Sequence, residues 1–240
     1  MRLVIFYYYS SELRLARNSN LAMRRTKEDA EKTRITILEA AETLFLEKGV
    51  AHTSLEHIAR QAGVTRGAVY WHFANKADLF TAMLNQVRLP PEQLVERISG
   101  CPEHDPLQTL RQLCVDALSG LVRDEKKQRI FTILLRRCEF TEELRPAEER
   151  HEAFINLFIE LCEQQFNNPA VRPRLHPGIC PRLAARTVHA VIIGLFHDWL
   201  RDPKILNPEV DISPIVDACF RGLVQDWRCC TPNDQAKPAP

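Results

Sequence analysis

The feature that most constrains this chain is a short helical pattern bounded by two structural signals, Gly63-Val-Thr-Arg-Gly-Ala-Val-Tyr-Trp-His-Phe-Ala-Asn-Lys76. Gly63 suits the residue that follows a helix end, and Thr65 is a good N-cap, so a new helix is predicted directly after it. In that helix Val69 and Phe73 are four residues apart and share an inward face. The remaining side chains therefore face outward.

This outward face carries groups that suit DNA recognition. It offers a glycine that permits close approach, a phenol, an indole, hydroxyl groups for phosphate oxygens, and positive charge at both ends. A short helix with an apolar back and such a front is typical of a recognition helix in a DNA major groove. Its candidate DNA contacts are Thr65, Arg66, Gly67, Ala68, Tyr70, Trp71, His72 and Lys76.

The preceding segment predicts a second short helix. Thr53 and Glu56 have the spacing of a capping box, and an apolar stripe follows at helical spacing. The two helices separated by Gly63 form a helix-turn-helix, with Thr53 and Ser54 as further candidate DNA contacts. On geometry alone, an ordinary helical hairpin inside a core is an equally good interpretation.

The residues themselves favour DNA binding. The stretch from Thr53 to Phe73, followed by Asn75-Lys-Ala-Asp-Leu79, closely resembles the DNA-binding domain of the TetR family of repressors. The segment from Thr33 to Val50 resembles that family's first helix. The resemblance covers roughly residues 24–88 and implies a homodimer that binds a palindromic operator in double-stranded DNA.

The overall charge adds no general attraction to nucleic acid, since the net charge is only +1. DNA affinity must then come from locally placed cations. Arg24 and Arg25 precede the first helix, where an arm could reach the DNA, although a solvated terminus explains them equally well.

The 240 residues divide into four expected parts. Residues 1–22 are interpreted as a non-native or disordered extension, with Met23 as the preferred start. Residues 23–88 form the DNA-binding domain, residues 89–228 a helical ligand-binding and dimerisation domain, and residues 229–240 a disordered tail. The apolar run Leu3–Tyr9 is too short to span a bilayer, so a cytoplasmic protein is expected. A membrane-associated regulator that uses this run is the alternative.

The rest of the chain predicts an all-α fold, because no strand alternation is present. The expected helices are 27–48, one capped by Asn75 and interrupted near Pro90-Pro91, 105–123, 125–140, 142–167, 181–201 and 213–227, with a loop over 168–181. The segments 87–94, 137–144 and 196–203 also resemble the multidrug-efflux-repressor branch of the TetR family, which implies a repressor released by a lipophilic inducer.

Eight cysteines raise the question of redox chemistry. Cys114, Cys138, Cys162 and Cys219 lie in apolar helical patterns, where cysteine acts as a small hydrophobe. A redox-sensing regulator using the adjacent Cys229-Cys230 is a second alternative. No zinc spacing is present, and no metal or cofactor is expected.

A small-molecule pocket is predicted in place of an active site. The chain has no Gly-rich phosphate loop, G-x-S-x-G or HExxH motif, so no enzymatic activity is expected. The apolar helix 181–201 contains His189, whose ring nitrogens need partners when buried. His189 can be interpreted either as a core histidine or as a ligand-binding histidine, and the family resemblance favours ligand binding. The candidate pocket residues are Phe131, Leu135, His151, Phe154, Phe158, His189 and Phe196.

The last two helices are expected to pair with a second copy. Their apolar side chains exceed what one subunit must bury, although some must serve its own core. They are Ile192, Leu195, Phe196 and Trp199 on one helix, and Ile215, Cys219, Leu223 and Trp227 on the other.

Overall fold

The computed structural model describes the backbone of residues 5–89, 91–99 and 105–228, and side chains from Lys27 onward. The described residues form an all-α fold, as predicted, with one isolated bridge between Leu175 and Val224 in place of any strand. The elements are α1 (Ile5–Lys48), α2 (Leu55–Ala62), α3 (Arg66–His72), α4 (Lys76–Leu84), α5 (Pro91–Ser99), α6 (Pro106–Arg123), α7 (Glu125–Thr132), η1 (Ile133–Arg137), η2 (Glu142–Leu144), α8 (Arg145–Asn167), η3 (Arg172–Arg174), α9 (Pro181–Arg201) and α10 (Pro208–Leu223).

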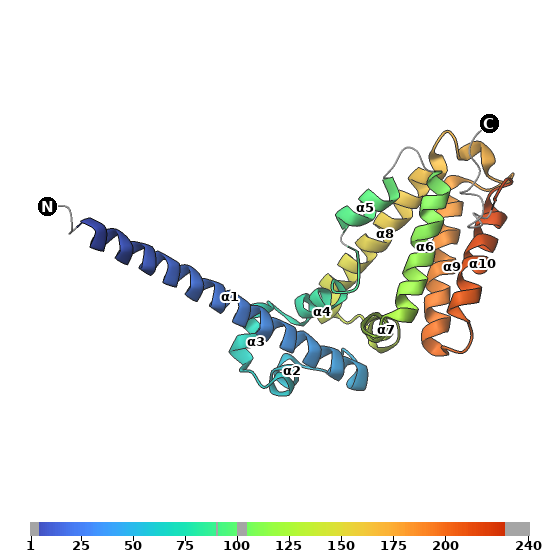
Figure 1. The fold of residues 1–240 in the computed structure, drawn as a ribbon. Coiled ribbons are helices and arrows are strands. Elements are labelled where there is room, and N and C mark those ends of the chain that lie inside the picture. The colour runs from blue at the N-terminus through green and yellow to red at the C-terminus, as the bar shows by residue number, and fades with distance from the viewer. Residues whose placement is uncertain (1–4, 90, 100–104, 229–240) are drawn as a thin grey trace.

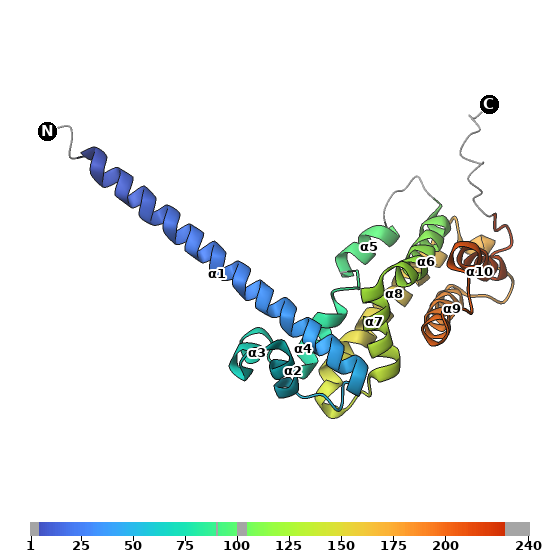
Figure 2. The same ribbon diagram turned by 60° about the horizontal axis from the view of Figure 1, so that its bottom comes forward.

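The helices form two groups (Figure 1). The helices α2, α3 and α4 gather around the C-terminal part of α1, while the N-terminal part of α1 projects away from the body. In the other group α8 packs on α9, and α6 packs on α10. Figure 2 shows from a second direction that α5 lies beside α6 and α8.

The first helix is longer than predicted. It begins at Ile5 and not at Lys27, and residues 5–48 contain no proline or glycine that would interrupt it. It stops at Gly49, as predicted, where φ is 83°. Residues 229–240, including Cys229 and Cys230, lie outside the described residues.

Two large cores correspond to the two groups. One unites the inner faces of α1 to α4 with Ile130, Ile133, Leu144 and Ala147 from α7, η1, η2 and α8. The other joins α6, α8, α9 and α10 around Phe166 and other buried side chains. Because α7, η1 and α8 contribute to the first core, the helix-turn-helix part packs directly on the C-terminal part.

Two predicted C-terminal helices have different bounds. The expected helix 125–140 ends at Thr132 and continues as the π-turn η1, whose last carbonyl, on Arg137, accepts a hydrogen bond from the Val50 amide at 3.0 Å. The last helix begins at Pro208, because the Asn207 side chain caps it, and not at residue 213. It ends at Leu223 and not at 227, since the following backbone pairs with residues 174–176.

Candidate DNA-binding surface and ligand cavity

The turn that precedes α3 has the predicted local structure. Gly63 adopts the left-handed conformation with φ 67°, and the Thr65 hydroxyl accepts a hydrogen bond from the Ala68 amide at 3.1 Å. Val69 and Phe73 are buried on the inner side. These findings confirm the predicted helix-turn-helix and the predicted inner face of its second helix.

The outer face of α3 carries an exposed aromatic and cationic surface. Trp71 is 72% exposed and Tyr70 46%. The Arg66 guanidinium donates to the Tyr70 hydroxyl at 3.3 Å and lies over the Tyr70 ring. These groups stand free of the core, so the face can enter a groove without rearrangement of the fold.

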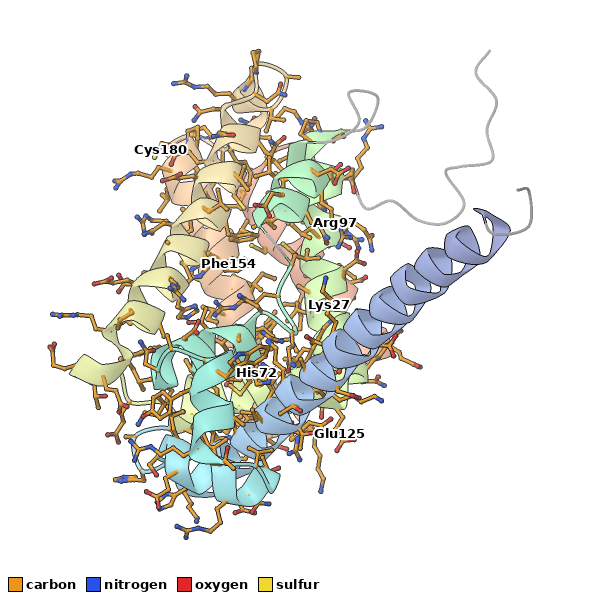
Figure 3. All side chains as sticks on the ribbon, turned by 90° about the vertical axis from the view of Figure 1, so that its left-hand side faces the viewer. Lys27, His72, Arg97, Glu125, Phe154 and Cys180 are labelled. Carbon is orange, nitrogen blue, oxygen red and sulfur yellow. The ribbon has the colours of Figure 1, made fainter. Side chains whose placement is uncertain are left out.

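Two other positions on α3 refine this surface. A β-carbon on Gly67 would meet only the Thr65 hydroxyl, at 3.8 Å, so local packing does not require glycine there. His72, labelled in Figure 3, is half-buried, and burial and then Arg34 lower its pKa. Its ring is therefore neutral near pH 7 and can donate one hydrogen bond to a phosphate.

The predicted capping box is wrong by one residue. Ser54, and not Thr53, is the N-cap of α2, and its partner is His57 in place of Glu56. Thr53 is buried, and its hydroxyl donates a hydrogen bond to the Gly49 carbonyl at 2.9 Å, just after the end of α1. Its side chain is therefore unavailable to DNA, whereas Ser54 remains exposed.

Lys76 also differs from its predicted position. Its side chain is buried, and its ammonium donates to the Thr53 carbonyl at 3.2 Å and pairs with Glu143 at 2.6 Å. The Lys76 ammonium is therefore not available for the predicted contact with a DNA phosphate. Asn75 does cap α4, as predicted, by accepting from the Asp78 amide.

The N-terminal cations are only partly described. The side chains of Arg24 and Arg25 lie outside the described residues. Arg34 stacks its guanidinium over Phe73 at 5.4 Å, on the same side as α3. Arg34 therefore lies next to the recognition helix, where Glu31 pairs with its guanidinium at 3.7 Å and partly balances its charge.

A cavity of about 450 Å³ lies in the C-terminal part. Its walls come from the link after α4 and from α5, α6, α7, η1, α8 and α9, and most of them are apolar. All seven predicted pocket residues line it, namely Phe131, Leu135, His151, Phe154, Phe158, His189 and Phe196. The volume suits a drug-sized molecule.

Aromatic rings and two histidines shape this cavity. The rings of Phe131 and Phe196 meet edge to face at 5.1 Å, and Phe158 lies 6.3 Å from the His189 ring. Burial lowers the pKa of His189 and, with the nearby Arg88, lowers that of His151 to about 4. Both rings are neutral near pH 7, and each can offer one donor and one acceptor.

Arg88 is a charged residue of the cavity wall that was not among the predicted pocket residues. It belongs to the link between α4 and α5, and its guanidinium contacts the His151 Nδ1 atom at 2.5 Å and stacks on Phe154 at 5.0 Å. Burial lowers its pKa to about 10, so it stays charged near pH 7. The sequence does place this arginine between two apolar residues, Val87 and Leu89, and that pattern could have indicated a partly buried side chain.

The described cysteines give no support to a redox site. Cys114, Cys138, Cys162 and Cys219 are unpaired thiols, as is the exposed Cys180. Burial raises the pKa of the first four, to about 12 at Cys114 and about 11 at Cys138 and Cys219. High thiol pKa values disfavour the reactive thiolate.

The predicted pairing faces of α9 and α10 are partly used inside the chain. Phe196, Trp199, Leu223 and Trp227 are buried in the intrachain core. The exposed residues of α10 are Glu209, Val210, Pro214, Ala218, Arg221 and Gly222, of which Val210, Pro214, Ala218 and Gly222 form one row at intervals of four residues. The other four predicted residues, Ile192, Leu195, Ile215 and Cys219, are half-buried, and the pairing face stays a prediction.

The described part of the chain shows neither a metal-binding cluster nor a membrane-spanning helix. No group of three or more His, Cys, Asp or Glu side chains is placed to hold a metal ion. None of the described helices combines the length and apolar character needed to cross a bilayer.

The fold, the exposed recognition helix and the C-terminal cavity define a ligand-responsive type of DNA-binding regulator. Residues 37–83 match the bacterial regulatory proteins of the tetR family, and residues 105–224 match the C-terminal region of MAATS-type transcriptional repressors. The chain belongs to the TetR family and is a DNA-binding transcriptional repressor.

Its relatives include known efflux regulators. The crystal structure of NalD, the secondary repressor of the MexAB-OprM multidrug efflux pump in Pseudomonas aeruginosa, is 64% identical, with a TM-score of 0.80 over 82% of this chain and 100% of NalD. The regulator TtgR of Pseudomonas putida is 36% identical over 81% of this chain and 93% of its own length. The SmeT–triclosan complex is 32% identical, with a TM-score of 0.71 over 87% and 99% of the two chains. These findings confirm the predicted efflux-repressor branch.

Proposed function

We propose that this protein represses a multidrug efflux operon as a homodimer and leaves its palindromic operator when a lipophilic small molecule fills the cavity. The similarity to NalD and TtgR supports the efflux assignment. The proposed DNA contacts are Ser54, Thr65, Arg66, Gly67, Ala68, Tyr70, Trp71 and His72, with Arg24 and Arg25 from the N-terminal side.

One observation carries the ligand-release mechanism. The link directly after α4 supplies Gln86, Val87, Arg88 and Leu89 to the cavity wall. The helix α4 packs on α1 and shares a core with α2 and α3. A molecule that fills the cavity therefore presses on the segment that carries the helix-turn-helix.

The effect on DNA follows from spacing. Two recognition helices must be about 34–36 Å apart to enter successive major grooves on one face of DNA. A ligand releases the operator only if it binds a wrongly spaced conformer more tightly, and coupling of about 1–3 kcal/mol weakens operator binding roughly 5- to 150-fold.

The test uses the DNA upstream of the gene. A gel shift with the purified full-length protein should show one specific complex, and a thermal-shift screen should identify drug-like ligands. Calorimetric titration of such a ligand with and without operator then measures the coupling, which must be reciprocal. Equal ligand affinity in both states would remove the cavity from the control of DNA binding.

A further inference from the structure

The cavity has an unusual balance of charge for an apolar pocket. Among its lining residues Arg88, Arg97 and Lys127 are cationic, and Asp116 is the one carboxylate. Arg97 and Asp116 form an ion pair at 2.6 Å, with both side chains partly exposed. The Asp116 carboxylate is therefore neutralised by Arg97, and Arg88 and Lys127 leave the lining with a net positive charge.

Arg88 is a partly buried cation of the cavity wall. Within the described residues it has no carboxylate at ion-pair distance, and its partners are the His151 nitrogen and the Phe154 ring. The guanidinium has only donors, so His151 must accept through Nδ1 and carry its proton on Nε2. The charge of Arg88 is thus stabilised by a neutral acceptor and an aromatic face.

The surroundings of Arg88 are also free of acidic groups on its other side. A second hollow adjoins Arg88 and His151, and the one other charged residue in its lining is Arg150. A partly buried guanidinium between two hollows without a free carboxylate binds an anion more strongly than it binds a neutral acceptor. Its planar fork can donate two hydrogen bonds to the oxygens of a carboxylate or a sulfonate.

We propose that the cavity selects lipophilic weak acids, whose anionic group binds the Arg88 guanidinium in place of His151 while the aromatic walls hold the apolar body. This inference rests on the proposed function, in which the cavity holds the inducer. Figure 3 labels Phe154 on α8 and Arg97 on α5, the helices that flank this region. The acid would be bound at the link after α4, so its charge acts directly on the segment joined to the helix-turn-helix.

Two fluorescent probes of one skeleton test the charge preference. 8-Anilinonaphthalene-1-sulfonate carries an anionic group, and N-phenyl-1-naphthylamine lacks it. Titration of the full-length protein should show one sulfonate site per chain, displaced by the neutral probe. The sulfonate should bind about tenfold or more tightly than the neutral probe, as expected for a charge-assisted contact.

Arg88→Gln should lower the affinity for the sulfonate far more than the affinity for the neutral probe, so that the preference is lost. Arg172→Gln is the matched control and should preserve the preference, because Arg172 is exposed between α8 and α9 and does not line the cavity. Arg88→Lys keeps the charge and should retain most of the preference, which makes the test independent of whether Arg88→Gln folds.

Three outcomes would overturn the proposal: equal binding of both probes to the wild type, equal loss of both in Arg88→Gln, or an effect of Arg172→Gln as large as that of Arg88→Gln. Operator release by each probe is measured separately. Release by both probes without any dependence on Arg88 would preserve the ligand-release function and reject the anion site. Arg88-dependent sulfonate binding without operator release would preserve the anion site and reject the ligand-release function.

Discussion

The Lys76 ammonium lies 2.6 Å from a Glu143 carboxylate oxygen and joins the first turn of α4 to the η2 turn before α8. The Lys76 side chain is 5% exposed, whereas that of Glu143 is 57% exposed. The same ammonium donates to the Thr53 carbonyl before α2. One cation therefore connects the helix-turn-helix to the C-terminal part of the chain.

Lys76→Met should destabilise the fold by about 1–3 kcal/mol, because the buried Thr53 carbonyl loses its donor and the Glu143 carboxylate loses its cation. Glu143→Gln should cost only about 0–1 kcal/mol, since that carboxylate is largely in water. Urea denaturation measures both changes. Lys48→Met, at the exposed end of α1, is the lysine control. Equal effects of Lys76→Met and Lys48→Met would contradict a structural role for Lys76.

Arg66→Ala should relax sequence preference by roughly 1–3 kcal/mol at one operator position if the guanidinium reaches base edges. Tyr70→Ala should weaken binding to all sequences and also free Arg66 from its hydroxyl partner. Fluorescence anisotropy on operator and scrambled DNA at two salt concentrations separates these effects. Arg172→Ala, exposed in the connection between α8 and α9, serves as the charge control. Unchanged discrimination by Arg66→Ala would assign Arg66 to the phosphate backbone.

His151 should give stability a measurable pH dependence. Its pKa is lowered to about 4 by burial first, and then by Arg88 and His189. Between about pH 6.5 and 4 the unfolded chain binds a proton at this position that the folded chain does not, so stability falls as pH falls. The loss is at most about 1.4 kcal/mol per pH unit for one proton.

The measurement is the difference between the wild type and His151→Gln in urea denaturation at pH 7, 6 and 5. The wild type should lose more stability over this range than the variant. His197→Gln is the control, because His197 is exposed on α9. Parallel curves for the wild type and His151→Gln would show that His151 titrates normally.

Ala218→Glu should prevent dimerisation. Ala218 is exposed on α10 in one row with Val210, which is 61% exposed, so the charge disturbs no contact within the chain. Light scattering should show a monomer with unchanged circular dichroism, and operator binding should be lost because one recognition helix reads only one half-site. Ala170→Glu, in an exposed turn, should remain dimeric. A dimeric Ala218→Glu would place the interface elsewhere.

Local signals in the sequence were sufficient for much of the fold. The left-handed Gly63, the Asn75 cap and the bounds of α6 and α9 follow from residues within a few positions of one another. The seven predicted residues all line the cavity as well, and that prediction rested on a histidine within an apolar helix together with the family resemblance. Their role in ligand binding stays a prediction.

Only the tertiary structure decided where the long cations lie. Arg88 and His151 are 63 residues apart in the chain, and Lys76 reaches a carboxylate in a different part of the fold. The sequence alone marks lysine and arginine as surface residues, since a buried charge needs a partner that periodicity cannot locate. Backbone caps and apolar faces are therefore encoded locally. The environment of a charge is set by whichever distant segment supplies its acceptor, and that segment is brought near only when the helices pack.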